Sequence, residues 1–161
     1  MNRSVPARRA QSMGLGLGDY RLSLKLLAVG APLAVVAGYL GSRIPAMAAV
    51  YPLGGPLGPN ATALAAHAGK YLLYYFGFEF LFRGFLLMGI KDAFGPRGAN
   101  LVQACLATAF HLGKPAAEVI AAFPASLLFG WTTLRTRAIW CAVVVHWIVG
   151  VSLDWFLVLA R

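Results

Sequence analysis

The 161-residue chain is 60% hydrophobic and only 12% charged, with a mean hydropathy of +0.71 and a net charge of +9. Soluble globular domains carry about 25% charged residues, so this composition excludes that class and indicates a membrane protein. The positive charge does not indicate a nucleic-acid-binding protein, because the basic residues lie between apolar segments and form no basic stripe. They are typical of loops that set membrane orientation and of contacts with membrane lipids.

The apolar segments predict an all-α fold, a polytopic bundle of about five transmembrane helices. Residues 1–20 are polar, basic and Gly-rich, which predicts a flexible tail ahead of one transmembrane domain at residues 21–161. The expected spans, in chain order, are Leu22–Gly41, Thr62–Ile90, Ala99–Leu112, Ala116–Leu134 and Ile139–Leu159. A Pro- and Gly-rich loop is expected at Arg43–Asn60, and Gly95-Pro96 is expected to break the long second helix.

The charges of the loops predict the orientation. The basic residues on the side of the N-terminus are Arg3, Arg8, Arg9, Arg21, Lys25, Lys91, Arg97, Arg135 and Arg137, against Arg43, Lys70, Lys114 and Arg161 on the other side. Because cytoplasmic loops carry the excess of basic residues, the N-terminus is expected in the cytoplasm. We expect an integral protein of a bacterial inner membrane.

Four polar residues in apolar segments are the candidate site. Glu79 and Arg83 lie four residues apart in one span, where each charge costs about 2.5–3.5 kcal/mol on insertion scales. At about 1.5 Å per residue, Arg83 lies roughly 12 Å, His146 roughly 14 Å, Glu79 roughly 18 Å and His111 roughly 21 Å from the cytoplasmic helix ends. Three helices are therefore expected to direct these side chains into one central cavity.

Each of these residues also has a structural interpretation. Glu79 and Arg83 are in the favourable order for an ion pair one turn apart, and such a pair can simply close a helix bundle. His111 can cap backbone carbonyls at the end of its helix. His146 can form a hydrogen bond between helices.

Glu118 and Asp154 are possible supporting residues, expected near the external end of the same cavity. The structural interpretation of Glu118 is a favourable position in the first turn of a helix, and that of Asp154 is contact with the membrane interface. His67 is expected at the interface, away from the candidate site.

The string Phe78-Glu79-Phe80-Leu81-Phe82-Arg83-Gly84, followed by His111 and His146 on later helices, resembles the CPBP family over residues 70–155. This family comprises the type II CAAX prenyl endopeptidases and bacteriocin-processing enzymes, also called Abi-like proteins. Its pattern is Glu-Glu-x-x-x-Arg, then Phe-x-x-x-His, then His-x-x-x-Asn or Asp. Glu79 matches the second glutamate, and Arg83, His111 and His146 match the arginine and the two histidines.

Three positions depart from the family pattern. Phe78 stands in place of the first glutamate, which is thought to activate water in the family. Ala107 stands in place of the motif phenylalanine, and Gly150 in place of the Asn that stabilises the oxyanion.

The resemblance implies a glutamate-dependent intramembrane endopeptidase that acts on a membrane-associated peptide or protein without a cofactor. Glu79 is then the base, and His111 orients or shares the water. His146 stabilises the oxyanion, and Arg83 holds either Glu79 or the helix packing.

Three alternatives remain open. The first is a catalytically inactive relative that acts as a membrane scaffold or immunity-type protein, and the second is a transporter or channel subunit. The third is a zinc site formed by Glu79, His111 and His146, although no His-Glu-x-x-His spacing supports it. A protease loses its function when Glu79 or His146 is replaced and folding is intact, whereas a scaffold loses it only when folding fails.

Overall fold

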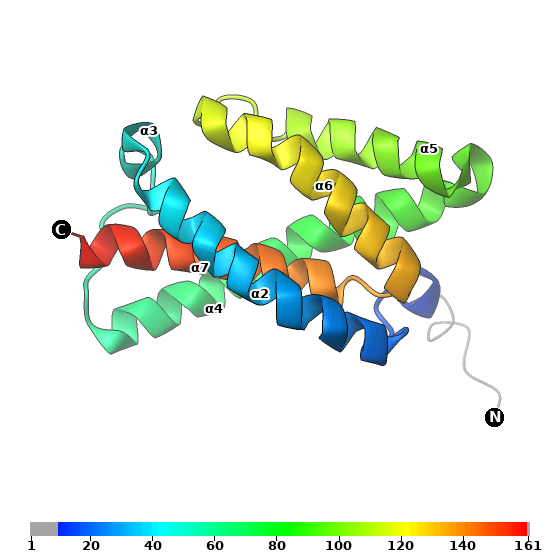
Figure 1. Ribbon diagram of the computed structural model, residues 1–161, viewed down its shortest axis with the longest axis horizontal. Helices are drawn as coiled ribbons and strands as arrows, with labels where there is room; N and C mark the ends of the chain where they lie inside the picture. Colours follow the sequence, from blue (N-terminus) through cyan, green and yellow to red (C-terminus); the bar gives the residue numbers. More distant parts are fainter. Residues whose placement is uncertain (1–9, 161) are drawn as a thin grey trace. The chain divides into compact units, whose positions relative to one another are not determined.

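The computed structural model describes residues 10–160, which contain helices and loops and no strand. The helices are α2 (Tyr20–Ser42), α3 (Pro45–Ala48), α4 (Ala61–Glu79), the π-helix η1 (Phe80–Leu87), α5 (Met88–Ala109), α6 (Ala116–Thr136) and α7 (Trp140–Leu159) (Figure 1). This confirms the predicted all-α class. The first nine residues of the predicted flexible tail lie outside the described residues.

Within the described residues, four helical stretches are long and apolar enough to cross a membrane, and one of them, Ala61–Ala109, has 49 residues. That stretch is not one straight helix, because Gly95 has φ 69° and ψ 160° inside α5, and the chain turns back there (Figure 1). A left-handed φ favours glycine, and Pro96 then starts the returning helix. The predicted break at Gly95-Pro96 is confirmed, and the helices are consistent with about five spans.

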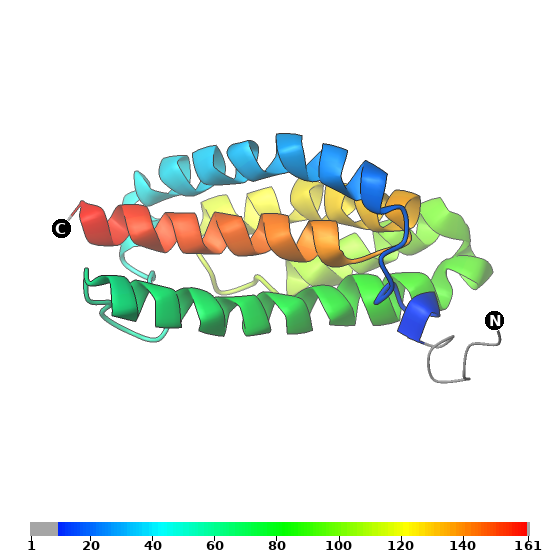
Figure 2. The same ribbon diagram turned by 90° about the horizontal axis from the view of Figure 1, so that it is seen from below.

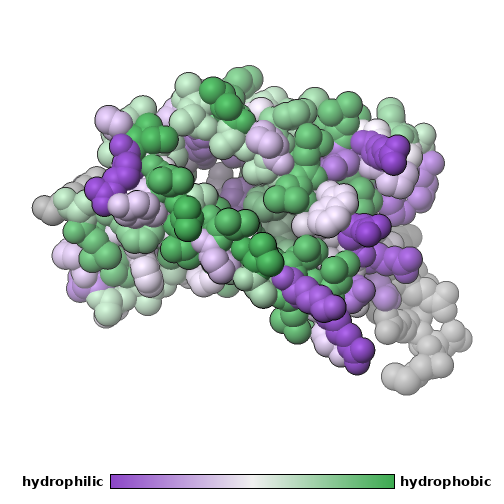
Figure 3. All heavy atoms as spheres, in the orientation of Figure 1, coloured by the Kyte–Doolittle hydropathy of each residue, from purple (hydrophilic) through white to green (hydrophobic). Residues whose placement is uncertain are grey.

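The outer surface of α2 explains why such a sequence needs a membrane. Its exposed apolar side chains include Leu24, Val29, Leu33, Val36 and Leu40. Hydrophobic side chains follow α2 across the face shown in Figure 3. In water, a contiguous apolar surface of this kind is an aggregation site, whereas in a lipid bilayer it contacts acyl chains at no cost.

The loop predicted at Arg43–Asn60 contains one short helix, α3. Pro45 lies at its start, where proline lacks only an N–H that would have no intrahelical partner. Met47 from α3 and Tyr51 from the following loop are buried against Leu153 and Leu157 of α7. The segment is therefore packed against α7.

The chain forms two compact units. The first consists of residues 10–26 and 77–142 within the described range, and the second of residues 27–76 and 143–160. The first unit holds the end of α4, η1, α5 and α6. The second holds most of α2, α4 and α7, together with α3.

In the second unit, α7 lies between α2 and α4 (Figure 2). Glycines on α2 allow the close approach of α7, since a Cβ at Gly38 would overlap Ser152 and a Cβ at Gly30 would be 3.0 Å from Val145. On the other side, the Trp147 indole donates a hydrogen bond to the Ala68 carbonyl of α4 (2.8 Å). Small residues and polar contacts of this kind hold membrane helices together, because lipid provides no hydrophobic driving force between them.

Candidate active site

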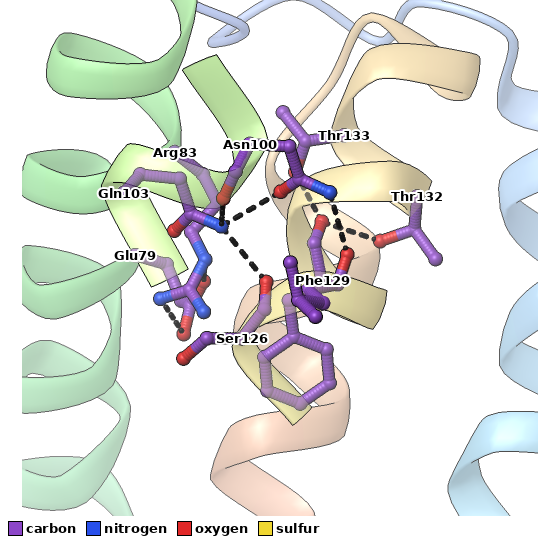
Figure 4. Close-up of polar contacts among 9 residues, drawn as sticks. Glu79, Arg83, Asn100, Gln103, Ser126, Phe129, Thr132 and Thr133 are labelled. Atoms are coloured by element: carbon purple, nitrogen blue, oxygen red, sulfur yellow. Dashed lines mark hydrogen bonds and ion pairs between the residues drawn. The ribbon is translucent and has the colours of Figure 1, made fainter. Parts of the chain in front are cut away.

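Glu79 and Arg83 form a buried ion pair in the first unit. Arg83 Nη1 donates a hydrogen bond to Glu79 Oε1 (3.2 Å), and Arg83 Nε lies 3.1 Å from Oε2 without the alignment of a hydrogen bond (Figure 4). The carboxylate side chain is 0% exposed and the arginine side chain 1% exposed. The predicted pair is therefore confirmed, and it is fully enclosed within the protein.

The local backbone is widened where the pair forms. Glu79 is the last residue of α4, and Arg83 lies in η1, whose π-helical hydrogen bonds span five residues instead of four. Gly84 allows the N-terminal segment to approach this turn, because a Cβ there would be 2.8 Å from the Met13 carbonyl oxygen. π-Helical segments are rare and occur frequently at functional sites, so the widening marks this region independently of the motif.

Aromatic rings surround the guanidinium group. Arg83 Cζ lies 5.7 Å from the ring centroid of Phe78 and 5.5 Å from that of Phe129 on α6. Both distances are within the range of cation–π attraction, which is strongest when the cation has lost its water. The arginine thus exchanges its hydration shell for one carboxylate and two ring faces.

Phe78 connects the ion pair to His111. Its ring centroid is 5.6 Å from the imidazole of His111, in an edge-on arrangement, and it also faces Arg83. Phe78, Phe82 and Ala107 form one buried cluster. Two of the departures from the family pattern, at positions 78 and 107, are therefore in the same cluster, with a large ring at one position and a methyl group at the other.

His111 is oriented by its own helix end. Its Nδ1 donates a hydrogen bond to the Ala107 carbonyl oxygen (2.7 Å), which agrees with the predicted capping role and fixes the ring. The other ring nitrogen, Nε2, lies 3.9 Å from Glu118 Oε1. Glu118 is in the first turn of α6, as expected, and accepts a hydrogen bond from Lys114 Nζ (2.9 Å). Glu118 is thus placed beside His111.

His146 lies on α7 in the second unit, where its ring packs on Tyr75 of α4 with centroids 4.3 Å apart. A Cβ at Gly150 would overlap the Tyr75 hydroxyl group. The space that a family Asn would use at position 150 therefore holds the Tyr75 side chain. The role of His146 in catalysis stays a prediction from the sequence.

His67 makes a buried contact that the sequence analysis did not predict, and its expected place at the membrane interface stays a prediction. His67 Nε2 donates a hydrogen bond to Asp154 Oδ2 (2.7 Å), and Asp154 is 0% exposed. The reason is that a buried carboxylate in an apolar environment requires a donor, and α4 provides one opposite α7. Asp154 accordingly pairs with His67 inside the second unit.

A polar network between α5 and α6 was not predicted. The Asn100 amide donates a hydrogen bond to the Leu127 carbonyl (3.0 Å). The Gln103 amide donates one to the Ser126 carbonyl (2.9 Å), as shown in Figure 4. A Cβ at Gly130 would overlap the Asn100 side chain. The signal for this network is the pair of amide residues three apart in an apolar segment, since such residues are used between membrane helices.

The structure thus brings Glu79, Arg83, His111 and Glu118 into one unit, with Phe78 between the ion pair and His111. It places His146 and Asp154 in the other unit. Among residues 10–160, no group of three or more His, Cys, Asp and Glu side chains could hold a metal ion.

A family model described as Type II CAAX prenyl endopeptidase Rce1-like matches residues 60–152, which is more than half of the chain. The match contains the ion pair, both motif histidines and all three departures from the family pattern. No curated protein and no solved structure gives a significant match. On the strength of this match and of the buried Glu79–Arg83 pair, the chain belongs to the Type II CAAX prenyl endopeptidase Rce1-like family.

Proposed function

We propose that this chain is an intramembrane endopeptidase in which Glu79 activates a water molecule. The observation that carries the proposal is the fully buried Glu79–Arg83 pair in a chain of a protease family. A charge inside a membrane protein is expensive and is generally kept for a function or for its partner. Here the partner is a single arginine one turn away, and the carboxylate remains at the motif position.

The reaction needs one base that later acts as an acid. The Glu79 carboxylate takes a proton from water, and the water oxygen forms a bond to the carbonyl carbon of the substrate peptide. The carbonyl becomes a tetrahedral oxyanion, and its collapse breaks the C–N bond. Glu79 then gives its proton to the departing amine. No covalent enzyme intermediate forms. The hydroxyl group of the water becomes part of the new carboxyl terminus, and its proton becomes part of the new amino terminus.

The other residues of the first unit have positioning roles in this proposal. Arg83 fixes the orientation of the Glu79 carboxylate and balances its charge through two pairs of atoms. His111 holds the water, with its ring oriented by the Ala107 carbonyl and by Glu118. The enclosed site excludes bulk water, which strengthens each of these electrostatic contacts.

The substrate class is a peptide segment of a membrane-associated protein. Such a segment already lies at the membrane, so it reaches a site enclosed among apolar helices without passing through water. The same proposal places the N-terminus in the cytoplasm of a bacterial cell, since the loops on that side carry the larger share of lysine and arginine.

A second candidate function is a membrane scaffold or immunity-type protein without catalysis. One observation favours it: the buried Phe78 ring stands at the position of the first family glutamate, and it packs against His111 and Arg83. A hydrophobic ring at this point excludes water from the space between the two groups.

The two candidates differ in the products found in the membrane. New protein N-termini are mapped by mass spectrometry in membranes that contain the wild type, Glu79→Gln or the exposed control Arg97→Gln, at matched abundance and thermal stability. The protease predicts cleavage sites with the wild type and Arg97→Gln that are missing with Glu79→Gln. Identical termini in all three membranes would support the scaffold.

A further inference from the structure

The first unit contains a cavity of about 1400 Å³ outside the candidate active site. Three segments form it: residues 11–19 near the N-terminus, the first part of α5 from Met88 to Pro96, and the C-terminal end of α6. Neither Glu79, Arg83, His111 nor Glu118 lines it. The proposed protease reaction does not use this space.

The acidic residues of the cavity are already engaged. Asp92 forms an ion pair with Lys91 (3.0 Å). Asp19 accepts a hydrogen bond from the Leu22 N–H (2.9 Å) and so caps the start of α2. Their negative charges therefore have partners of their own within the unit.

Two arginines give the cavity its binding character. Arg135 and Arg137 both line it, both are exposed, and within residues 10–160 neither forms an ion pair with a carboxylate. Guanidinium groups bind phosphate through paired N–H donors, a geometry that a lysine does not provide. An anion that enters the cavity meets two such groups.

The backbone around Arg137 is fixed. Arg137 has φ 57° and ψ 30° at the C-terminal cap of α6, a conformation that favours glycine, and it is the only non-glycine residue with positive φ in the described part of the chain. The adjoining Thr136 carbonyl accepts a hydrogen bond from Asp19 N–H (2.7 Å), and Ile139 N–H donates to the Gly14 carbonyl (3.0 Å). A charged side chain is thus held at a strained position on the cavity wall, as is common at functional sites.

A neighbouring tryptophan indicates the depth of the cavity in the membrane. The Arg135 guanidinium lies 5.8 Å from the ring of Trp131, which is exposed on the same helix end. Exposed tryptophans gather at the level of the lipid headgroups. The lining also contains the apolar side chains of Met88 and Leu134, which suit the acyl chains of a lipid better than bare phosphate.

We propose that this cavity binds a phosphate-bearing anion through Arg135 and Arg137. Two sources share that chemistry, the headgroup of an anionic phospholipid and a soluble phosphate ester. Basic pockets between membrane helices on the cytoplasmic side bind anionic headgroups, and the loop charges predict that this end faces the cytoplasm. The proposal is independent of protease activity, because none of the lining residues takes part in it.

The test is titration calorimetry on the full chain in a neutral detergent. The ligands are dihexanoyl-phosphatidylglycerol, dihexanoyl-phosphatidylcholine as the lipid without net charge, and glycerol phosphate as the soluble ester. The variant is Arg135→Gln/Arg137→Gly, because glycine suits the left-handed backbone at position 137 and preserves the fold. Arg21→Gln/Arg97→Gln removes the same number of charges from exposed positions of the same unit outside the cavity.

Saturable binding of phosphatidylglycerol that weakens on the order of tenfold in the cavity variant, and stays within about twofold in the control, supports the proposal. If glycerol phosphate binds with the same dependence on the variants, the ligand is a soluble ester; if only the lipid binds, it is a headgroup. Equal weakening in both double variants would show a general effect of surface charge and overturn the proposal. Unchanged binding in the cavity variant would overturn it as well.

Discussion

Glu79 and Arg83 meet through two pairs of atoms, Oε1 with Nη1 at 3.2 Å and Oε2 with Nε at 3.1 Å. The pair spans the point where α4 passes into the π-helix η1. At the protein surface, water replaces the lost partner of an ion pair. Both charges of this pair are buried, so each depends on the other much more strongly. The pair therefore has a structural effect and a chemical effect that experiments can separate.

Arg83→Ala is expected to destabilise the protein by about 3–5 kcal/mol, because it removes the guanidinium partner of a buried carboxylate. The double variant Glu79→Gln/Arg83→Met should lose less than the sum of the two single variants, because it leaves no unpaired charge. The measurement is the free energy of unfolding in mixed micelles with increasing fraction of denaturing detergent. Strict additivity of the two substitutions would contradict the coupling.

Phe78→Glu introduces a carboxylate between Arg83 and His111, at the position where the family pattern has its first glutamate. Because Phe78 packs against Ala107, the substitution also leaves a gap in a buried cluster. Phe78→Glu/Ala107→Phe should fill that gap and unfold at a higher temperature than Phe78→Glu alone. It should also cleave faster than the wild type, by up to about 10²-fold, since it adds a second base to the site. A double variant less stable than the single one would show that the two positions are independent.

Gly130→Ala is expected to lower the unfolding temperature, because the new methyl group overlaps the Asn100 side chain that joins α5 to α6. Gly89→Ala is the matched control in the same unit. No atom lies within 4 Å of a Cβ at Gly89, so alanine there should stabilise its helix by up to about 1 kcal/mol. If both substitutions have the same effect on thermal unfolding, close packing at Gly130 is not required.

Asp154→Asn and His67→Gln are each expected to lower the stability of the second unit by about 1–3 kcal/mol, since each removes one partner of a buried hydrogen bond. The effects should not add, because both variants lose the same contact. A double-mutant cycle on the unfolding free energy measures this coupling. A coupling energy near zero would mean that the 2.7 Å contact does not contribute to folding.

The positions of most helices were predictable because the apolar segments are interrupted by glycine and proline at residues 43–60, at Gly95-Pro96 and at residues 113–115. Gly95-Pro96 is the clearest case, since the residue types that predict a break also permit the observed turn. The Glu79–Arg83 pair was predictable for a similar reason, because residues four apart on a helix are neighbours.

Other features depend on contacts that sequence spacing does not contain. The sequence does not distinguish an α-helical turn from the π-helical turns of η1, because the two differ only in the backbone hydrogen bonds that they form. The burial of His67 depends on Asp154, which is 87 residues away in the sequence. A count of residues from the helix end gives the depth of a side chain but does not identify the partner that it meets.

In the proposed mechanism, Glu79 acts as the base that activates water. The most direct measurement is kcat/KM for cleavage by purified wild type, Glu79→Gln and Arg97→Gln of a peptide taken from a mapped cleavage site, at matched thermal stability. The kcat/KM of Glu79→Gln should fall by about 10²–10⁴-fold, because a general base is removed, whereas that of Arg97→Gln should equal the wild-type value. Cleavage by Glu79→Gln at the rate of the wild type would contradict the claim and make the buried pair a structural element alone.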